Sequence, residues 1–247
     1  MSQERAAIVL AAGQGKRMKS DIPKVLHRIH GRPLIAYLLD TLAVMEFTKT
    51  IVVIGFKGEL VQEALSSYPV TFVRQREQLG TGHAVQMAAP ELADFTGATL
   101  VALGDVPFLS ARSIKRLFDT HEKTGAAATC LTAMLDNPTG YGRVVRVDGS
   151  DRLKEIVEEK EAGAPVKKIR EINTGLMCFD TRRMFDALED VDNQNTQQEY
   201  YLTDTINILH RKGLRVSVVL ADNPDEVLGV NSLEQLAELE RKFPSPA

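Results

Sequence analysis

Tryptophan is absent from this chain of 247 residues, and only two cysteines occur, Cys130 and Cys178. Both lie within apolar runs, at a spacing that fits neither a metal site nor a disulfide framework. We therefore expect two buried thiols in a reducing compartment. No segment approaches the ~20 consecutive apolar residues of a membrane span, and the first apolar run is too short for a signal peptide. These observations predict a cytoplasmic protein.

The sequence also lacks a strong net charge. Thirty Lys and Arg face 33 Asp and Glu, which leaves a formal charge of -3. This balance gives no global reason to expect binding to nucleic acid or to a membrane, although a local basic patch can still hold a small anion. No repeat, low-complexity segment or linker divides the chain. We expect a single domain over residues 1–247, and nothing in the sequence indicates its oligomeric state.

Short apolar runs alternate with helical patterns in the first half, which is typical of an α/β fold with a mostly parallel sheet covered on both faces. We expect strands at 6–12, 50–55, 70–73 and 98–105, and helices at 34–45, 59–66, 82–92 and 113–123. The second half predicts a small β-rich lobe, with strands at 126–135, 171–180 and 214–221 and a hairpin at 143–148 and 152–159. Helices are expected at 199–213 and, at the end of the chain, at 232–243.

The first strand runs into "VLAAGQGKRMKSDIPKVLH", which contains two glycines and a cluster of basic residues. A P-loop requires a glycine at Leu10 and a hydroxyl at Arg17, and a dinucleotide fingerprint requires a glycine at Met18. Both interpretations therefore fail. Between Gly13 and Arg28 there are five basic residues and one acid, a charge that suits a triphosphate. The residues alone leave a solvated basic loop equally open.

The run "LAAGQGKRM…PKVLH" resembles the signature of sugar nucleotidyltransferases. Further matching motifs follow in order: "QREQLGTGHA", "LGDVP", "GYGR", "IVEEKEA", "EINTG", "QEYYLTD" and "GVN". Together they resemble the N-acetylglucosamine-1-phosphate uridyltransferase domain of the bacterial bifunctional enzymes that make UDP-N-acetylglucosamine. The resemblance covers roughly residues 6–240 and implies a Rossmann-like fold of the nucleotide-diphospho-sugar transferase type, with the small β-rich lobe binding the sugar.

Two features depart from that family. Lys16 stands where the family commonly has threonine, beside a phosphate site. The left-handed β-helix of hexapeptide repeats, which forms the second domain of the family, has no counterpart in this sequence. We therefore expect no acetyltransferase activity.

The resemblance implies transfer of UMP from UTP to N-acetylglucosamine-1-phosphate with Mg²⁺, giving pyrophosphate and UDP-N-acetylglucosamine, a precursor of cell-wall peptidoglycan and lipopolysaccharide. Carried over by motif, the catalytic residues are Arg17 and Lys24, and the metal ligands are Asp105 and Asn231. The residues expected to bind the nucleotide are Leu10, Ala11, Ala12, Gly13, Lys24, Gln75, Gly80 and Thr81. Those expected to bind the sugar are Gly142, Glu158, Asn173, Tyr201 and Thr203.

Other interpretations remain open. One is a transferase that uses another sugar-1-phosphate or another nucleotide, and a second is a nucleotide-sugar sensor without turnover. We expect His83 to pack or cap in the first turn of its helix. In "IVEEKEA", Glu159 and Glu161 are expected to belong to a solvated acidic run.

Overall fold

Strand β1 (Arg5–Ala11) shows why this chain forms a covered parallel sheet. Its side chains alternate between two apolar clusters, with Ile8 in one and Val9 in the other, and both are fully buried. A strand that is buried on both faces needs a continuous apolar run, and residues 6–11 supply it. The computed structural model describes residues 4–244, and for Lys16 it describes the backbone alone.

The nine-stranded sheet runs in the order β11-β7-β10-β6-β1-β4-β5, and β8 and β9 are attached beside β10. Neighbours β6–β1–β4–β5 are parallel, as are β11 and β7, whereas β10 is antiparallel to both β6 and β7. Beyond β1, the strands are β4 (Lys49–Ile54), β5 (Thr71–Arg74), β6 (Ala98–Leu103), β7 (Ala128–Met134), β8 (Arg143–Arg146), β9 (Leu153–Val157), β10 (Glu171–Asp180) and β11 (Val216–Leu220). Strands β2 (Arg28–Ile29) and β3 (Arg32–Pro33) form a separate small hairpin.

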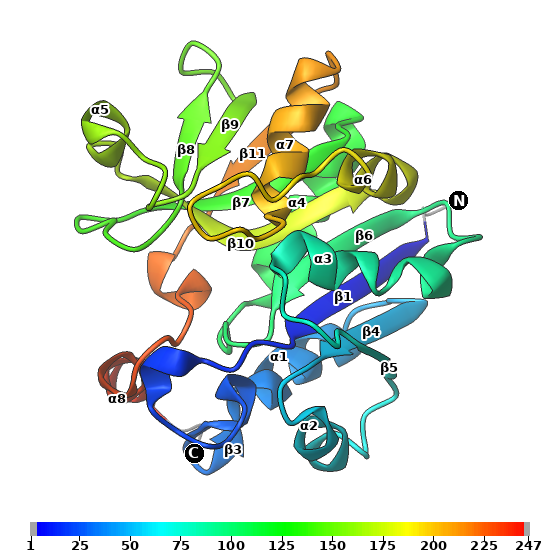
Figure 1. The fold of residues 1–247 in the computed structure, drawn as a ribbon, viewed down its shortest axis with the longest axis vertical. Helices are drawn as coiled ribbons and strands as arrows, with labels where there is room; N and C mark the ends of the chain where they lie inside the picture. The colour runs from blue at the N-terminus through cyan, green and yellow to red at the C-terminus, as the bar shows by residue number, and fades with distance from the viewer. Residues whose placement is uncertain (1–3, 245–247) are drawn as a thin grey trace.

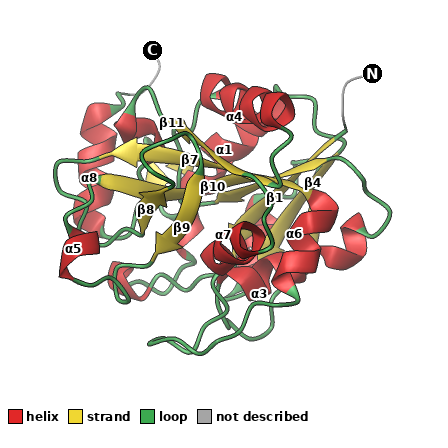
Figure 2. Cartoon of the chain, turned by 90° about the horizontal axis from the view of Figure 1, so that it is seen from above, coloured by secondary structure: helices red, strands yellow, loops and turns green. Residues whose placement is uncertain are grey.

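Helices cover both faces of the sheet, as Figures 1 and 2 show. On one face lie α1 (Leu34–Ala43), α2 (Gly58–Ala64) and α4 (Ala111–Thr124). On the other lie α3 (Thr81–Gln86), α6 (Thr181–Leu188) and α7 (Leu202–Arg211), with the 3₁₀ turn η3 (Ala89–Leu92). The α/β class and the mostly parallel sheet are therefore confirmed. None of the helices described between residues 4 and 244 is long and apolar enough to cross a membrane.

Some elements differ from their expected bounds for identifiable reasons. The helix expected over 82–92 is divided into α3 and η3, and Pro90 in η3 has no N–H with which to continue an α-helix. Helix α7 begins only at Leu202, because Tyr201 has extended dihedrals. Helix α6 follows β10 directly and was missed, although Asp180 caps it by accepting a hydrogen bond from the Arg183 N–H.

The last helix, α8 (Leu233–Lys242), packs against segments from the N-terminal part of the chain. Its Leu239 joins a small apolar cluster with Met18 of η1 (Lys16–Met18) and with Ile29. Beyond the helix, Phe243 stacks on Phe108 with ring centroids 4.1 Å apart. This packing brings the segment before α8 against the loop that follows β1.

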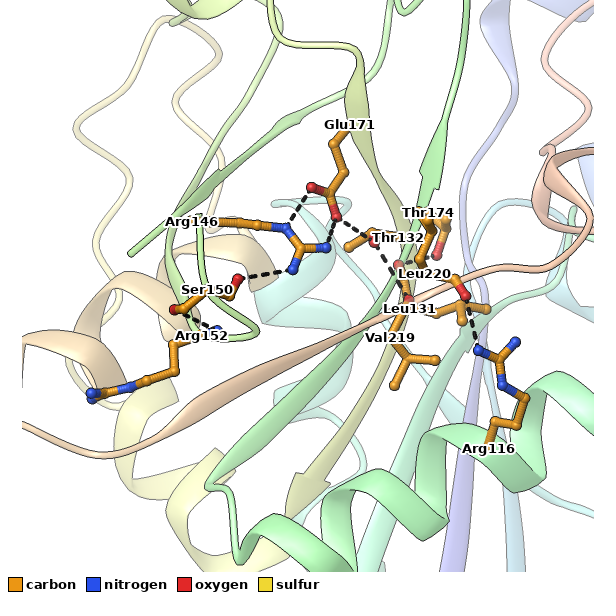
Figure 3. A network of polar contacts seen from close by, with 10 residues as sticks. All are labelled: Arg116, Leu131, Thr132, Arg146, Ser150, Arg152, Glu171, Thr174, Val219 and Leu220. Carbon is orange, nitrogen blue, oxygen red and sulfur yellow. Dashed lines mark hydrogen bonds and ion pairs between the residues drawn. The ribbon is translucent and has the colours of Figure 1, made fainter. Parts of the chain in front are cut away.

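A buried polar network fixes the start of β10 (Figure 3). Glu171, 9% exposed, accepts two hydrogen bonds from the Arg146 guanidinium of β8, at 2.7 and 2.6 Å. It also accepts one from the Thr132 hydroxyl of β7 at 2.6 Å. One carboxylate thus joins three strands two residues before Asn173. Breaking such a pair leaves a buried charge without compensation.

We expect Arg146→Met to lower the free energy of unfolding by roughly 2–3 kcal/mol, because the buried Glu171 carboxylate would lose the guanidinium that donates two hydrogen bonds to it. Chemical denaturation measures this change. Lys115→Met is the control, since it breaks an exposed pair with Asp119 on α4 and should cost about 0.5 kcal/mol or less. Equal effects of the two substitutions would contradict a structural role for the Glu171 network.

Candidate active site

A cleft of about 430 Å³ opens at the carboxyl ends of β1 and β6 and extends toward the β8–β9 hairpin. Ligand sites of open α/β sheets lie at this edge. Every residue predicted for the site lines the cleft except Tyr201. The cleft residues come from segments far apart in the chain, from Leu10 to Asn231.

The two glycines of the loop after β1 lie in different surroundings. Around Gly13 nothing lies within 4 Å of the place where a Cβ would stand, so this position is open beside the cleft. At Gly15, where φ is +68°, a Cβ would lie 2.7 Å from the Lys24 Cβ. Gly15 thus allows the loop to pass close over Lys24. Lys16 opens the turn η1, and its side chain lies outside the described part of the chain.

Two cations and two oxygen ligands meet at the floor of the cleft. The Lys24 ammonium forms an ion pair with Asp105 and donates to the Asn231 side-chain oxygen at 3.1 Å. The Arg17 guanidinium donates to the same oxygen at 2.8 Å. Asp105 is only 6% exposed. An oxygen of each of Asp105 and Asn231 therefore contacts the same positive charge, which lies between them.

This oxygen pair fits a magnesium site of the kind that phosphates complete. Mg²⁺ commonly takes one or two protein oxygens and receives the rest from phosphates and water. Among the described residues, no group of three or more His, Cys, Asp or Glu side chains could hold a metal ion. Asp105 with Asn231 instead matches the kind of site in which phosphates and water complete the coordination.

Asn231 reaches the cleft because the segment before α8 is held on both sides. The Val230 N–H donates to the Asp105 carbonyl at 2.9 Å, and the Asn231 N–H donates to the Gln235 side chain at 2.7 Å. Ser232 caps α8 by accepting from the Gln235 N–H. Its local sequence makes Asn231 an ordinary residue before a helix cap; the resemblance implied a metal ligand, and the fold brings its side chain to the same lysine that Asp105 binds.

The other end of the cleft floor holds Gln75 and Gly80. Gln75 follows β5, is 3% exposed, and donates its backbone N–H to the Ile54 carbonyl of β4 at 2.8 Å. Gly80 has φ 110° and ψ 175°, a region that is almost restricted to glycine. A Cβ at Gly80 would lie 2.5 Å from the Tyr200 carbonyl oxygen. A side chain at position 80 is therefore excluded on two grounds.

Two segments of the predicted site are bonded to each other here. The Gly82 N–H donates to the Tyr200 carbonyl at 2.7 Å, and the Leu202 N–H donates to the Thr81 hydroxyl at 3.0 Å. The "LGTGHA" and "YYLTD" motifs thus form one wall, although more than 100 residues separate them along the chain. His83 lies on α3, packs against Tyr200, and contacts the Gln75 amide.

The sugar end of the predicted site is formed by β8, β9 and β10. Strand β10 has a bulge after Asn173. Within it, Gly175 has φ +78°, and a Cβ built at this position would collide with the Leu103 side chain. The Asn173 N–H donates to the Gly142 carbonyl at 2.8 Å. Asn173 and Gly142 are thus held together across two strands. The bulge interrupts the regular register of β10 just after the residue that lines the cleft, Asn173.

Glu158 lies opposite Asn173 and accepts a hydrogen bond from the Thr203 hydroxyl at 2.9 Å. Burial raises the pKa of Glu158 above its ordinary value, and the bond from Thr203 opposes the shift in part. Tyr201 lies outside the cleft. It lines a neighbouring cavity of about 340 Å³, and its hydroxyl accepts from the Gln197 amide at 2.7 Å. A sugar contact by Tyr201 stays a prediction.

The acidic run "EEKEA" is only partly solvated: our expectation is wrong for Glu159, which is half-buried, and it is confirmed for Glu161, which is exposed. Glu159 pairs with Arg143 at 2.8 Å, and Arg143 is 2% exposed. Arg143 also donates to the Tyr141 carbonyl, in the turn that carries Gly142 into the cleft. Glu161 accepts from the Thr196 N–H at 3.0 Å. The sequence contains the "GYGR" motif, but the residues around its arginine give no sign that this side chain is buried.

We expect Glu158→Gln to flatten the dependence of stability on pH. Because the folded-state pKa of Glu158 is raised, the native state retains a proton that the unfolded chain has released, and stability falls as pH rises through that window. Glutamine cannot ionise, so the variant should melt at a higher temperature than wild type at pH 8, with the difference shrinking toward pH 5. Thermal melts at several pH values measure this. Parallel profiles for the two proteins would contradict it.

The chain matches the family described as MobA-like NTP transferase domain over residues 7–202. The bifunctional protein GlmU of Shouchella clausii is 47% identical over 236 residues, which are 96% of this chain and 52% of that protein. GlmU of Brevibacillus brevis is 48% identical over 234 residues, covering 95% and 50%. The chain thus spans about half the length of these relatives.

A solved structure of UDP-glucose pyrophosphorylase in complex with UDP-glucose has the same fold. The TM-score is 0.79, and the match covers 97% of this chain and 98% of that one, at 18% sequence identity. At this identity the likeness extends to the architecture of the sheet and its helices.

Proposed function

Because this chain belongs to the family of MobA-like NTP transferase domains, and so is a nucleotidyltransferase, we propose that it transfers UMP from UTP to N-acetylglucosamine-1-phosphate. The products would be UDP-N-acetylglucosamine and pyrophosphate. One observation carries the proposal: a single cleft joins the cluster of Arg17, Lys24, Asp105 and Asn231 to an amide beside Gly80 and to a polar end at Glu158 and Asn173. The curated relatives that share half their length with the chain support it.

The chemistry is a displacement at the α-phosphorus. A phosphate oxygen of the sugar-1-phosphate attacks in line with the departing pyrophosphate, so the bond to the β-phosphate oxygen breaks as the new P–O bond forms. The nucleophile is already ionised at neutral pH and needs no general base. The main barrier is the approach of two polyanions, which positioning and positive charge must overcome.

Arg17 and Lys24 would supply that charge. In this structure both cations bind oxygens of Asp105 or Asn231. Phosphate oxygens of a bound nucleotide would offer Arg17 an anionic partner in place of an amide oxygen, and they would offer Lys24 an anionic partner when Asp105 binds the metal. We assign Arg17 to the leaving pyrophosphate and Lys24 to the α-phosphate, where charge develops.

Asp105 and Asn231 would hold Mg²⁺. The ion would neutralise phosphate charge and orient the triphosphate. Asp105 lies in the turn that follows β6, and Asn231 lies in the segment before α8, so the fold itself sets their separation. Gly229, whose Cβ would stand 3.3 Å from an Asp105 oxygen, leaves the carboxylate clear.

The base would bind at Leu10 to Gly13, Gln75, Gly80 and Thr81, and the sugar at Gly142, Glu158, Asn173 and Thr203. Uracil offers an N–H beside a carbonyl oxygen. The Gly80 N–H donates to no acceptor among residues 4–244, and it lies at the cleft wall next to Gln75. An amide and a free N–H are complementary to that edge of uracil. A buried carboxylate such as Glu158 suits sugar hydroxyls.

A sensor without turnover is the alternative from a different functional class. It is disfavoured by the presence of both cations and both oxygen ligands in one connected cluster, in which Lys24 contacts Asp105 and Asn231, and Arg17 contacts Asn231. Binding a nucleotide sugar requires cations for its phosphates, whereas phosphoryl transfer also uses a metal to neutralise the developing charge. A transferase for another sugar-1-phosphate is separated from our proposal by the assay below.

We expect pyrophosphate release with UTP, N-acetylglucosamine-1-phosphate and Mg²⁺. CTP, GTP and ATP, and the sugars glucose-1-phosphate and glucosamine-1-phosphate, should react at least roughly a hundredfold more slowly, because each leaves a polar group of the site without its partner. A coupled pyrophosphate assay measures the panel. Binding of UDP-N-acetylglucosamine without any release would instead support the sensor, and preference for another sugar would change the assigned acceptor.

We expect Asp105→Ala to lower kcat by roughly a thousandfold or more, because the variant loses a metal ligand. Asp119→Ala is the matched control: Asp119 lies exposed on α4, does not line the cleft, and forms an ion pair with Lys115. Steady-state kinetics in Mg²⁺ and circular dichroism measure activity and folding. Near-wild-type turnover of folded Asp105→Ala would contradict the metal assignment.

A further inference from the structure

The Gln75 side-chain amide is held by two contacts on one atom. Its nitrogen lies 3.0 Å from the Gly80 carbonyl oxygen and 3.1 Å from Nδ1 of His83. Gln75 is 3% exposed, so water has little part in these contacts. His83 itself does not line the cleft, whereas Gln75 and Gly80 do. Any effect of His83 on a ligand must therefore pass through Gln75.

These contacts determine the orientation of the amide. A backbone carbonyl can only accept, so the Gln75 atom facing Gly80 must be the nitrogen. That nitrogen has a second hydrogen, and it points to His83 Nδ1. His83 Nδ1 must then be an acceptor, which places the ring proton on Nε2. One imidazole tautomer and one amide orientation are mutually required.

The orientation leaves the Gln75 carbonyl oxygen for the cleft. No donor among residues 4–244 forms a hydrogen bond with that oxygen, whereas the nitrogen of the same amide has two partners. At this point the cleft wall therefore offers an acceptor. Uracil carries an N–H at ring position 3 and can donate to it. Cytosine carries a bare nitrogen at the same position and would meet lone pair against lone pair.

We propose that His83 is a positioning residue for base choice: by accepting from Gln75 it holds the carbonyl oxygen of that amide toward the base and so favours uracil over cytosine. The inference rests on the proposed use of UTP and extends it to a residue outside the cleft. His83 is in turn held by its place on α3, which is bonded to the Tyr200 carbonyl through Gly82, and by its contact with the Tyr200 ring.

The test compares two substitutions at one position. His83→Leu removes the acceptor, whereas His83→Asn places an amide oxygen where Nδ1 stands and can restore the bond. Without the acceptor one amide hydrogen has no partner, and the amide can turn over. We expect His83→Leu to lower the preference for UTP over CTP by roughly fivefold, the factor that one neutral hydrogen bond provides. His83→Asn should keep the wild-type preference.

The preference is measured as the ratio of kcat/KM for the two nucleotides, or of their dissociation constants by calorimetry where CTP turnover is too slow. The KM for the sugar phosphate should stay unchanged, since its predicted ligands lie at the other end of the cleft. A purely structural role would move both nucleotides equally and leave the ratio intact. His83→Ala removes the same acceptor and replaces the leucine variant if that one does not fold.

Gln75→Ala supplies the decisive cross-check. In that background His83→Leu should change the ratio no further, because the amide through which it acts is gone. An unchanged ratio in folded His83→Leu, or equal loss in the leucine and asparagine variants, overturns the inference for His83. Failure of the proposed function has a different signature: wild type would then show no preference for UTP at all.

Discussion

The Lys24 ammonium lies between Asp105 and Asn231, and its contacts with these two side chains hold the charged part of the cleft together. It joins three distant parts of the chain: the loop after β1, the end of β6 and the segment before α8. Arg17 adds a second cation to the same Asn231 oxygen. No local element could produce this arrangement, because each partner needs the full sheet and the return of the C-terminal helix to reach its position.

Two supporting structures keep these groups in place. On one side the apolar cluster of Met18, Ile29 and Leu239 fastens α8 against the first loop. On the other, the Glu171 carboxylate joins three strands just before the bulge that turns Asn173 toward the cleft. Charged cleft residues are thus carried by rigid neighbours, which limits the reorganisation needed when a ligand binds.

Sequence patterns predicted the sheet well because β1, β4 and β6 are buried on both faces and read as continuous apolar runs. They failed where a residue depends on a distant partner. Glu159 looks solvated in its acidic run, yet it pairs with a buried arginine. His83 packs in the first turn of α3 as expected, but only the fold identifies its partners, the Tyr200 ring and the Gln75 amide.

A contribution to stability does not explain why the chain has the Lys24–Asp105 ion pair. Removing two charges from water costs free energy that their attraction often fails to recover, so an apolar pair of similar size would hold the fold at least as well. Asp105, at 6% exposure, bears most of that cost. A folded protein keeps such an arrangement where the charges serve a ligand. Here the oxygens that hold a lysine in this structure are the kind that a phosphate-bound metal prefers, and the lysine they would release has phosphate oxygens to bind. The proposed function thus accounts for a pair of charges that stability alone does not explain.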